Sequence, residues 1–122
     1  PGVETRGTLL YTYGVREGKI SLEQMCRLLS ENPAKLYGMY PEKGCIAPGS
    51  TADLVVMDPE KEAVISADSQ HYAMDYAPFE GRKIKGCIDK VYLHGTLVVD
   101  KGAVQIEKAG RYVPRKKYTA PQ

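Results

Sequence analysis

The sequence has no tryptophan, a single phenylalanine and no long apolar run. No stretch approaches the roughly 20 apolar residues that a membrane-spanning helix needs, so we expect no membrane partner. The chain also lacks a Cys-x-x-Cys pair, a His-x-His pair, a Gly-x-Ser-x-Gly turn and a glycine-rich phosphate loop. The sequence therefore offers no metal-binding histidine pair, no nucleophile elbow and no phosphate-binding loop. Judged from its residues alone, the chain has no convincing active site.

Charge is neither scarce nor one-sided. Charged residues make up 26% of the 122 residues, and the formal net charge is +2. The basic excess lies mostly in the C-terminal tail, without the dense basic face of a nucleic-acid-binding domain, so we expect no nucleic-acid partner. No signal peptide opens the chain, and its first residue is proline instead of methionine, which predicts a processed or excised piece.

Three cysteines, Cys26, Cys45 and Cys87, lie far apart in the sequence. An odd number without a disulfide framework predicts reduced thiols in a cytoplasmic protein. A zinc site formed by these cysteines with His71 and His94 would lack ligand spacing, so we do not expect one. His94 is expected to be a turn residue, and no carboxylate spacing supports His71 as a base.

Residues 44–59 separate a helical part of the sequence from a strand-rich part. Pro48-Gly49-Ser50 predicts a turn. The apolar run Leu54–Met57 predicts a strand covered on both faces. Asp58-Pro59 predicts the end of that strand, because proline has no donor for a sheet.

Three helices are expected before this stretch. The first covers residues 4–16. The second follows Ser21, which begins a capping box. Its expected apolar face contains Leu22, Met25, Cys26 and Leu29, and we interpret Met25 and Cys26 as core residues.

The third helix is expected to begin at Asn32-Pro33, since asparagine can cap a helix and proline suits its first position. Leu36 and Met39 would form its buried side. Gly38 is expected to end it.

The strand-rich part predicts short strands joined by tight turns. His94-Gly95 has the composition of a type I′ hairpin turn, and Lys101-Gly102 predicts a second turn. A long ordered loop is expected over residues 68–81. The predicted strands cover residues 62–66, 88–93, 96–100 and 103–107.

Several separated motifs occur in an order that resembles the C-terminal signature of the amidohydrolase superfamily. They are Asn32-Pro33-Ala34-Lys35, Gly38, Lys43-Gly44-Cys45-Ile46, Gly49 and Ala52–Asp58. Other motifs resemble its dihydropyrimidinase or D-hydantoinase branch. These are Pro1–Arg6, Leu9-Leu10-Tyr11, Pro78-Phe79-Glu80-Gly81 and Gly110-Arg111-Tyr112.

The resemblance implies an enzyme with a (β/α)8 barrel and a small β-sandwich. This chain would supply the closing helices of the barrel followed by the C-terminal strands of the sandwich, a mixed α and β fold class. The implied domains are the C-terminal barrel helices over 1–43, the C-terminal part of the β-sandwich over 44–109, and a basic tail over 110–122.

The resemblance also implies the chemistry of the parent enzyme. That enzyme would hydrolyse the cyclic amide bond of dihydropyrimidines or 5-substituted hydantoins, using two zinc ions and a carboxylated lysine. The family's metal ligands, catalytic aspartate and substrate-contacting asparagine all lie upstream of the residue that matches Pro1. We therefore carry over no catalytic, substrate-binding or metal residue, and expect the isolated chain to be inactive. Glu4 and Arg6 would lie near the chemistry but are expected to hold their loop.

The sequence leaves two alternatives open. One is a non-catalytic relative that resembles the collapsin-response mediators and serves in assembly. The other is a stand-alone β module for protein contacts. For a piece separated from the rest of its barrel and sandwich, uncovered apolar stripes and strand edges predict a homo-oligomer.

Overall fold

The computed structural model describes residues 2–117. Helices come first and strands follow, so the predicted mixed α and β class is confirmed. The chain divides into two compact units. Among the described residues, one unit contains 2–22 together with 57–87, and the other contains 23–56 together with 88–117. The predicted domain boundaries at 43/44 and 109/110 stay a prediction.

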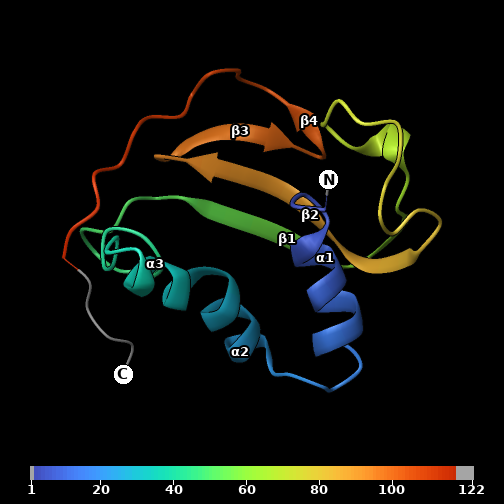
Figure 1. The fold of residues 1–122 in the computed structure, drawn as a ribbon, viewed down its shortest axis with the longest axis horizontal. Helices are drawn as coiled ribbons and strands as arrows, with labels where there is room; N and C mark the ends of the chain where they lie inside the picture. The colour runs from blue at the N-terminus through green and yellow to red at the C-terminus, as the bar shows by residue number, and fades with distance from the viewer. Residues whose placement is uncertain (1, 118–122) are drawn as a thin grey trace. The chain divides into compact units, whose positions relative to one another are not determined.

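The first helix is continuous from Arg6 to Val15 (Figure 1). It consists of α1, Arg6–Leu10, and a π-helical segment, η1, Tyr11–Val15. The helix predicted over 4–16 is therefore confirmed, with a start two residues later. Gly18 forms the turn after it at a φ of 71°.

The second helical run contains α2, Leu22–Cys26, the π-helical η2, Arg27–Glu31, and α3, Asn32–Leu36. These segments follow one another without a break, so the prediction of a separate helix that begins at Asn32 is wrong. Asn32 is itself helical, with φ −64° and ψ −44°, and its N–H donates to the carbonyl of Arg27. A wide π-type turn just before Pro33 relieves the clash between a proline ring and the preceding turn.

The end of this run follows the sequence prediction, but its buried side does not. Gly38 has a φ of 69° and ends the helix, with the Met39 N–H donating to the Ala34 carbonyl at 2.8 Å. Ala34 is buried, whereas Leu36 is 54% exposed and Met39 is half-buried. None of the helices within residues 2–117 is long and apolar enough to cross a bilayer.

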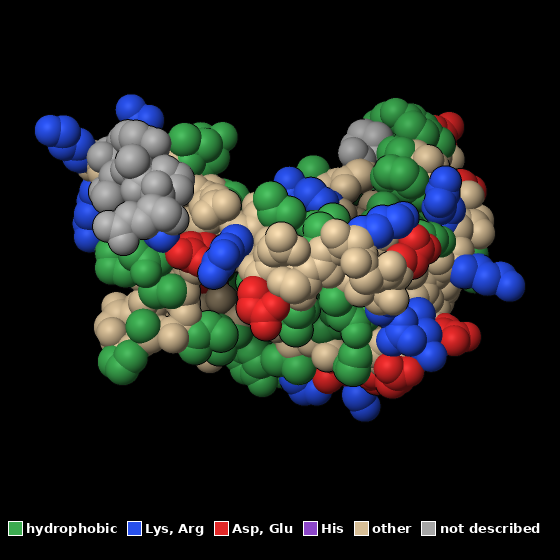
Figure 2. Space-filling view, turned by 90° about the horizontal axis from the view of Figure 1, so that it is seen from below, with side chains coloured by type: hydrophobic (Ala, Val, Ile, Leu, Met, Phe, Trp, Pro, Cys, Tyr) green, Lys and Arg blue, Asp and Glu red, His purple; other side chains and the backbone are tan. Residues whose placement is uncertain are grey.

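The predicted apolar face of the second helix is mostly uncovered within this chain. Met25 is buried, Leu29 is half-buried, and Leu22 is 52% exposed. Cys26 is exposed, so its interpretation as a core residue is wrong. Figure 2 shows hydrophobic side chains (green) at the surface among charged ones.

Strand β1, Leu54–Val64, passes through Asp58-Pro59 without ending. The predicted stop at Pro59 and the separate strand over 62–66 are therefore wrong. The strand order in the sheet is β1-β2-β3-β4 (Figure 1), so β1 lies at an edge, where a proline can be accommodated. Asp58 supports this position, because its Oδ1 accepts hydrogen bonds from the N–H groups of Glu60 (3.0 Å) and Lys61 (3.2 Å).

The first half of β1 is also less covered than its apolar sequence predicts. Val55 is 60% exposed and Val56 is 43% exposed, and the two side chains point to opposite faces of the strand. The prediction of a strand covered on both faces is wrong for this chain.

The other strands are β2, Lys83–Leu93, β3, Thr96–Asp100, and β4, Ala103–Val104, paired antiparallel from β2 onward. β3 has its predicted bounds, β2 begins five residues earlier than predicted, and β4 is shorter. The His94-Gly95 turn has positive φ at both residues, 52° and 78°, which confirms the predicted turn. Residues 68–81 form the predicted loop, apart from a 3-10 turn, η3, at Ala67–Ser69.

The three cysteines are unpaired, as predicted. Cys26 is exposed, while Cys87 is buried in a core cluster and burial raises the pKa of its thiol. Because the thiolate is the reactive form, we expect iodoacetamide to label Cys26 first and Cys87 more slowly than either other thiol. Mass spectrometry of peptides from a timed alkylation would measure the three rates. Labelling of Cys87 as fast as Cys26 would contradict the observed burial.

Candidate functional site

The contact between the first helix and β2 is built from backbone and side-chain groups at successive positions. The ring of Tyr11 lies against Gly86, which has a φ of 105°; a Cβ there would lie 2.2 Å from Cδ1 of the ring. At the next position, Thr12 Oγ1 accepts a hydrogen bond from the Lys85 N–H (3.2 Å) and lies 3.1 Å from the Lys85 carbonyl oxygen. These contacts fix the helix on β2 in one register.

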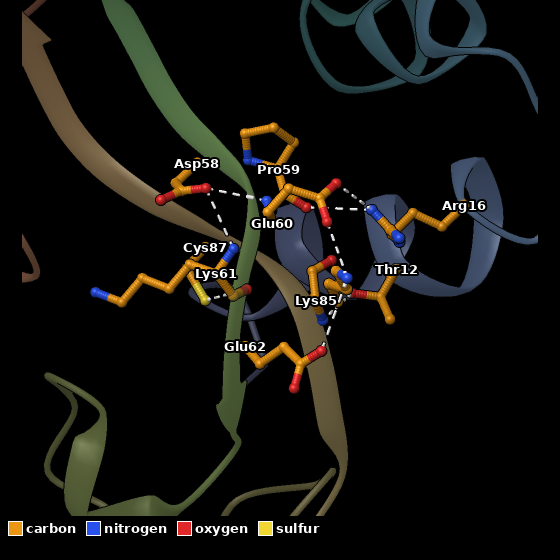
Figure 3. Close-up of polar contacts among 9 residues, drawn as sticks. All are labelled: Thr12, Arg16, Asp58, Pro59, Glu60, Lys61, Glu62, Lys85 and Cys87. Atoms are coloured by element: carbon orange, nitrogen blue, oxygen red, sulfur yellow. Dashed lines mark hydrogen bonds and ion pairs between the residues drawn. The ribbon is translucent and has the colours of Figure 1, made fainter.

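A chain of ion pairs links the end of this helix to β1 and β2 (Figure 3). Arg16 Nη1 lies 3.0 Å from Glu60 Oε1 and donates to the Pro59 carbonyl (3.3 Å). Lys85 Nζ lies 2.9 Å from Glu60 Oε2 and 3.8 Å from Glu62 Oε1. Lys85 and Arg16 lower the pKa of Glu60. The Glu60 side chain is 68% exposed, so water screens these pairs and each stabilises the fold only slightly.

An open groove of about 480 Å³ lies beside this network. Its lining residues are Thr12, Tyr13, Glu62, Ala63, Val64, Lys83, Ile84 and Lys85. Two polar groups of the groove already have partners in the protein: the Tyr13 hydroxyl donates to the Lys83 carbonyl (2.5 Å), and Lys85 pairs with carboxylates. The groove lies where the first helix meets β1 and β2.

Glu4 and His71 form a pair that the sequence analysis missed. Glu4 Oε1 lies 2.7 Å from His71 Nδ1, and Glu4 Oε2 accepts a hydrogen bond from the His71 N–H at 2.9 Å. The two residues are 67 positions apart, so no spacing in the sequence could have indicated the contact. Glu4 thus contacts the segment around His71, and its expected role of holding its own loop stays a prediction.

Asp53 forms the second contact between a carboxylate and a histidine. Its Oδ1 accepts a hydrogen bond from the His94 N–H (2.9 Å) and lies 3.7 Å from His94 Nδ1, while its Oδ2 pairs with Lys43. Burial alone would raise the pKa of Asp53, but the Lys43 ammonium and the His94 N–H outweigh burial and lower it. His94 is thus the predicted turn residue, and Asp53 attaches that turn to the start of β1.

The two zinc ions implied by the resemblance do not fit the residues described here. Within residues 2–117, no group of three or more His, Cys, Asp or Glu side chains could hold a metal ion. The Glu4–His71 and Asp53–His94 pairs each offer one histidine and one carboxylate, whereas catalytic zinc has three protein ligands. We therefore assign no zinc-holding role to any side chain within residues 2–117.

The chain is similar in sequence and in structure to known proteins. The amidohydrolase family profile matches residues 2–98. A D-hydantoinase from Ralstonia pickettii is 48% identical over 119 residues, which are 97% of this chain and 26% of that protein. A solved D-hydantoinase structure superposes with a TM-score of 0.93 at 46% identity, over 98% of this chain and 26% of the other. A dihydropyrimidinase from Brevibacillus agri superposes with a TM-score of 0.91 at 43% identity, over 94% and 25%.

The chain spans about a quarter of the length of these relatives. The resemblance to the dihydropyrimidinase or D-hydantoinase branch is confirmed, because the likeness extends over nearly all of the chain. The predicted fold class, closing barrel helices followed by sandwich strands, agrees with the superposition on hydantoinase structures. By its sequence and its fold, the chain belongs to the amidohydrolase family.

Proposed function

We propose that this chain is the C-terminal portion of a cyclic amidase that opens the ring of dihydropyrimidines or 5-substituted hydantoins. The observation that carries the proposal is the 48% identity to a D-hydantoinase along 97% of the chain. A stand-alone β module would not need the helical part to follow an enzyme so closely. The identity covers helices and strands alike, and this favours the enzyme over such a module.

In the proposed reaction, water adds to a ring carbonyl and the adjacent C–N bond breaks. The carbonyl carbon becomes a carboxylate and the released nitrogen takes a proton, which gives an N-carbamoyl amino acid. Two zinc ions with a carboxylated lysine, held outside this chain, would supply the Lewis acid and the nucleophilic water. The residues of this chain would support that site indirectly, by fixing the first helix on β1 and β2.

We further propose that residues 1–43 complete the barrel, that 44–109 belong to the small β-sandwich and that 110–122 are a basic tail. The uncovered Val55 and Val56 on the edge strand β1 support a homo-oligomer, since exposed apolar edges recruit other chains. Three unpaired thiols support a cytoplasmic location, where reducing conditions keep cysteines free.

The proposal predicts that the 122-residue chain alone is inactive while a longer protein that contains it is active. The assay would follow ring opening of dihydrouracil and hydantoin by loss of ultraviolet absorbance, with zinc added to both samples. A known D-hydantoinase serves as the positive control, and buffer without protein as the blank. Activity of the isolated chain above the blank would overturn the proposal that the metal site lies outside this chain. A longer protein that is inactive and lacks a His-x-His pair would instead favour the non-catalytic assembly protein.

A further inference from the structure

We propose that Glu4 anchors the loop over residues 67–81 to the segment before α1, and that the conformation of this loop depends on the Glu4 carboxylate. This inference does not rest on the proposed function. It rests on contacts within one compact unit, which contains both segments.

The first observation is that Glu4 uses both of its oxygens on one residue. Oε2 accepts from the His71 N–H at 2.9 Å and Oε1 lies 2.7 Å from the ring Nδ1. The shorter distance falls in the range of charge-assisted hydrogen bonds. A single carboxylate therefore fixes both the backbone and the ring of His71, which removes more freedom than a contact to the ring alone.

The second observation is that another carboxylate holds the opposite side of the same turn. Glu80 Oε2 accepts a hydrogen bond from the Ala67 N–H at 2.8 Å. The 3-10 turn η3, Ala67–Ser69, thus lies between two backbone N–H groups that donate to carboxylates, one at Ala67 and one at His71. The hydroxyl of the next residue, Tyr72, donates to the Tyr76 carbonyl at 3.3 Å, and burial together with the charges of Glu4 and Glu80 raises the pKa of this phenol.

The third observation concerns what the anchored loop carries. After Tyr72 the loop has no helix or strand of its own until β2 begins. This segment carries three large apolar side chains that are only partly covered: Met74 (43% exposed), Tyr76 (51%) and Phe79 (38%). Such side chains would sample many positions on a loop fixed only at its ends, because ordering each residue has a cost in conformational entropy. The Glu4 contact shortens the free segment from its N-terminal side.

The ring contact also determines the form of the imidazole. Nδ1 must carry a proton to donate to Glu4, so the neutral ring is the Nδ1–H tautomer. The chain has only two histidines, and Nδ1 of the other, His94, has no hydrogen-bond partner among residues 2–117. The two rings therefore serve as reporter and internal control in one sample.

The test uses the full 122-residue chain labelled with ¹⁵N. In the wild type, we expect a slow amide exchange rate at His71 and an Nδ1–H signal from its ring. Glu4→Ala should speed exchange at the His71 amide about tenfold, as expected for the loss of one typical hydrogen bond. It should shift the ring nitrogens of His71 and leave those of His94 unchanged. Cleavage by chymotrypsin after Tyr72 should also become faster.

Glu80→Ala is the matched control, because it removes a carboxylate from the same turn without touching His71. It should speed exchange at the Ala67 amide only. Glu4→Gln retains one acceptor oxygen, so its His71 amide should exchange at a rate between those of the wild type and Glu4→Ala. This variant keeps the proposal testable if Glu4→Ala does not fold. The Ile65 amide, which donates to the Arg82 carbonyl at 2.9 Å, reports whether the unit remains folded. A His71 amide that exchanges equally fast in the wild type and in both Glu4 variants, with Ile65 still protected, would overturn the proposal.

Discussion

Replacing Gly86 with alanine is expected to destabilise the chain by about 3 kcal/mol, the sum of a backbone and a packing effect. Gly86 has a φ of 105°, which side chains other than glycine rarely adopt. A Cβ at this position would lie 2.2 Å and 2.5 Å from two carbon atoms of the Tyr11 ring. The ring cannot move away freely, because the neighbouring Thr12 holds the same turn of the helix on Lys85.

Gly81→Ala separates the two effects. Gly81 lies in the same compact unit and also has a positive φ, 77°, but a Cβ there would meet no atom of the described residues within 4 Å. Gly81→Ala should lower the free energy of unfolding by about 1–2 kcal/mol, the cost of the backbone conformation alone. Urea unfolding followed by circular dichroism would measure both variants. Adding Tyr11→Ala should remove most of the extra cost at Gly86, and equal losses for Gly86→Ala and Gly81→Ala would refute the packing argument.

Tight turns were predicted best from the sequence, because their rules are local. A type I′ hairpin turn requires positive φ at both central residues. Glycine adopts positive φ freely and histidine can adopt it, so His94-Gly95 forms the turn. Gly38 ended its helix for the same reason. Strand β3 followed from the two turns that bound it, and its predicted limits were correct.

Proline was the signal that failed, because its effect depends on surroundings that the sequence does not give. Pro59 breaks a central strand but not an edge strand, and only the order of the sheet shows that β1 is an edge. Pro33 begins many helices, yet here a π-type turn allows it to continue one. Local propensity was overridden by the tertiary structure in both cases.

Burial and long-range pairing were beyond the reach of pattern analysis. Val55 and Val56 have the apolar side chains typical of a buried strand, but within this chain both lie at the surface. The Glu4–His71 contact joins residues 67 positions apart, and His94 meets Asp53 across 41 positions. Such contacts follow from how segments pair in three dimensions, and no spacing rule encodes them.

Replacing Asp53 with alanine is expected to cost about 2 kcal/mol, because hydrogen bonds to a charged group are worth more than neutral ones. The change leaves Lys43 without its carboxylate and the His94 N–H without its acceptor. A neighbouring backbone contact, from the Gly95 N–H to the Ala52 carbonyl at 2.9 Å, depends on the same attachment. The His94-Gly95 turn should therefore separate from the start of β1.

Asp58→Ala is the matched control for this variant. Asp58 also accepts two backbone hydrogen bonds, but from Glu60 and Lys61 in its own strand. Its loss should cost less, since no distant segment is released. Double substitution of Asp53 and Lys43 would give the coupling energy of the ion pair.

The same residue gives the chain a defined response to acid. The pKa of Asp53 is lowered on folding, so its carboxylate form stabilises the native state. That stabilisation is complete above the ordinary value of 3.8 and is lost as the pH falls through the lower value of the folded chain. Asp53→Asn should accordingly differ most from the wild type at neutral pH, and the two free energies of unfolding should converge in acid. A difference that stays constant from neutral to strongly acid conditions would show that the charge of Asp53 does not stabilise the turn. The side-chain oxygen of the asparagine can still accept a hydrogen bond from the His94 N–H. A lower free energy of unfolding for Asp53→Asn at neutral pH would therefore come from the lost negative charge and its ion pair with Lys43.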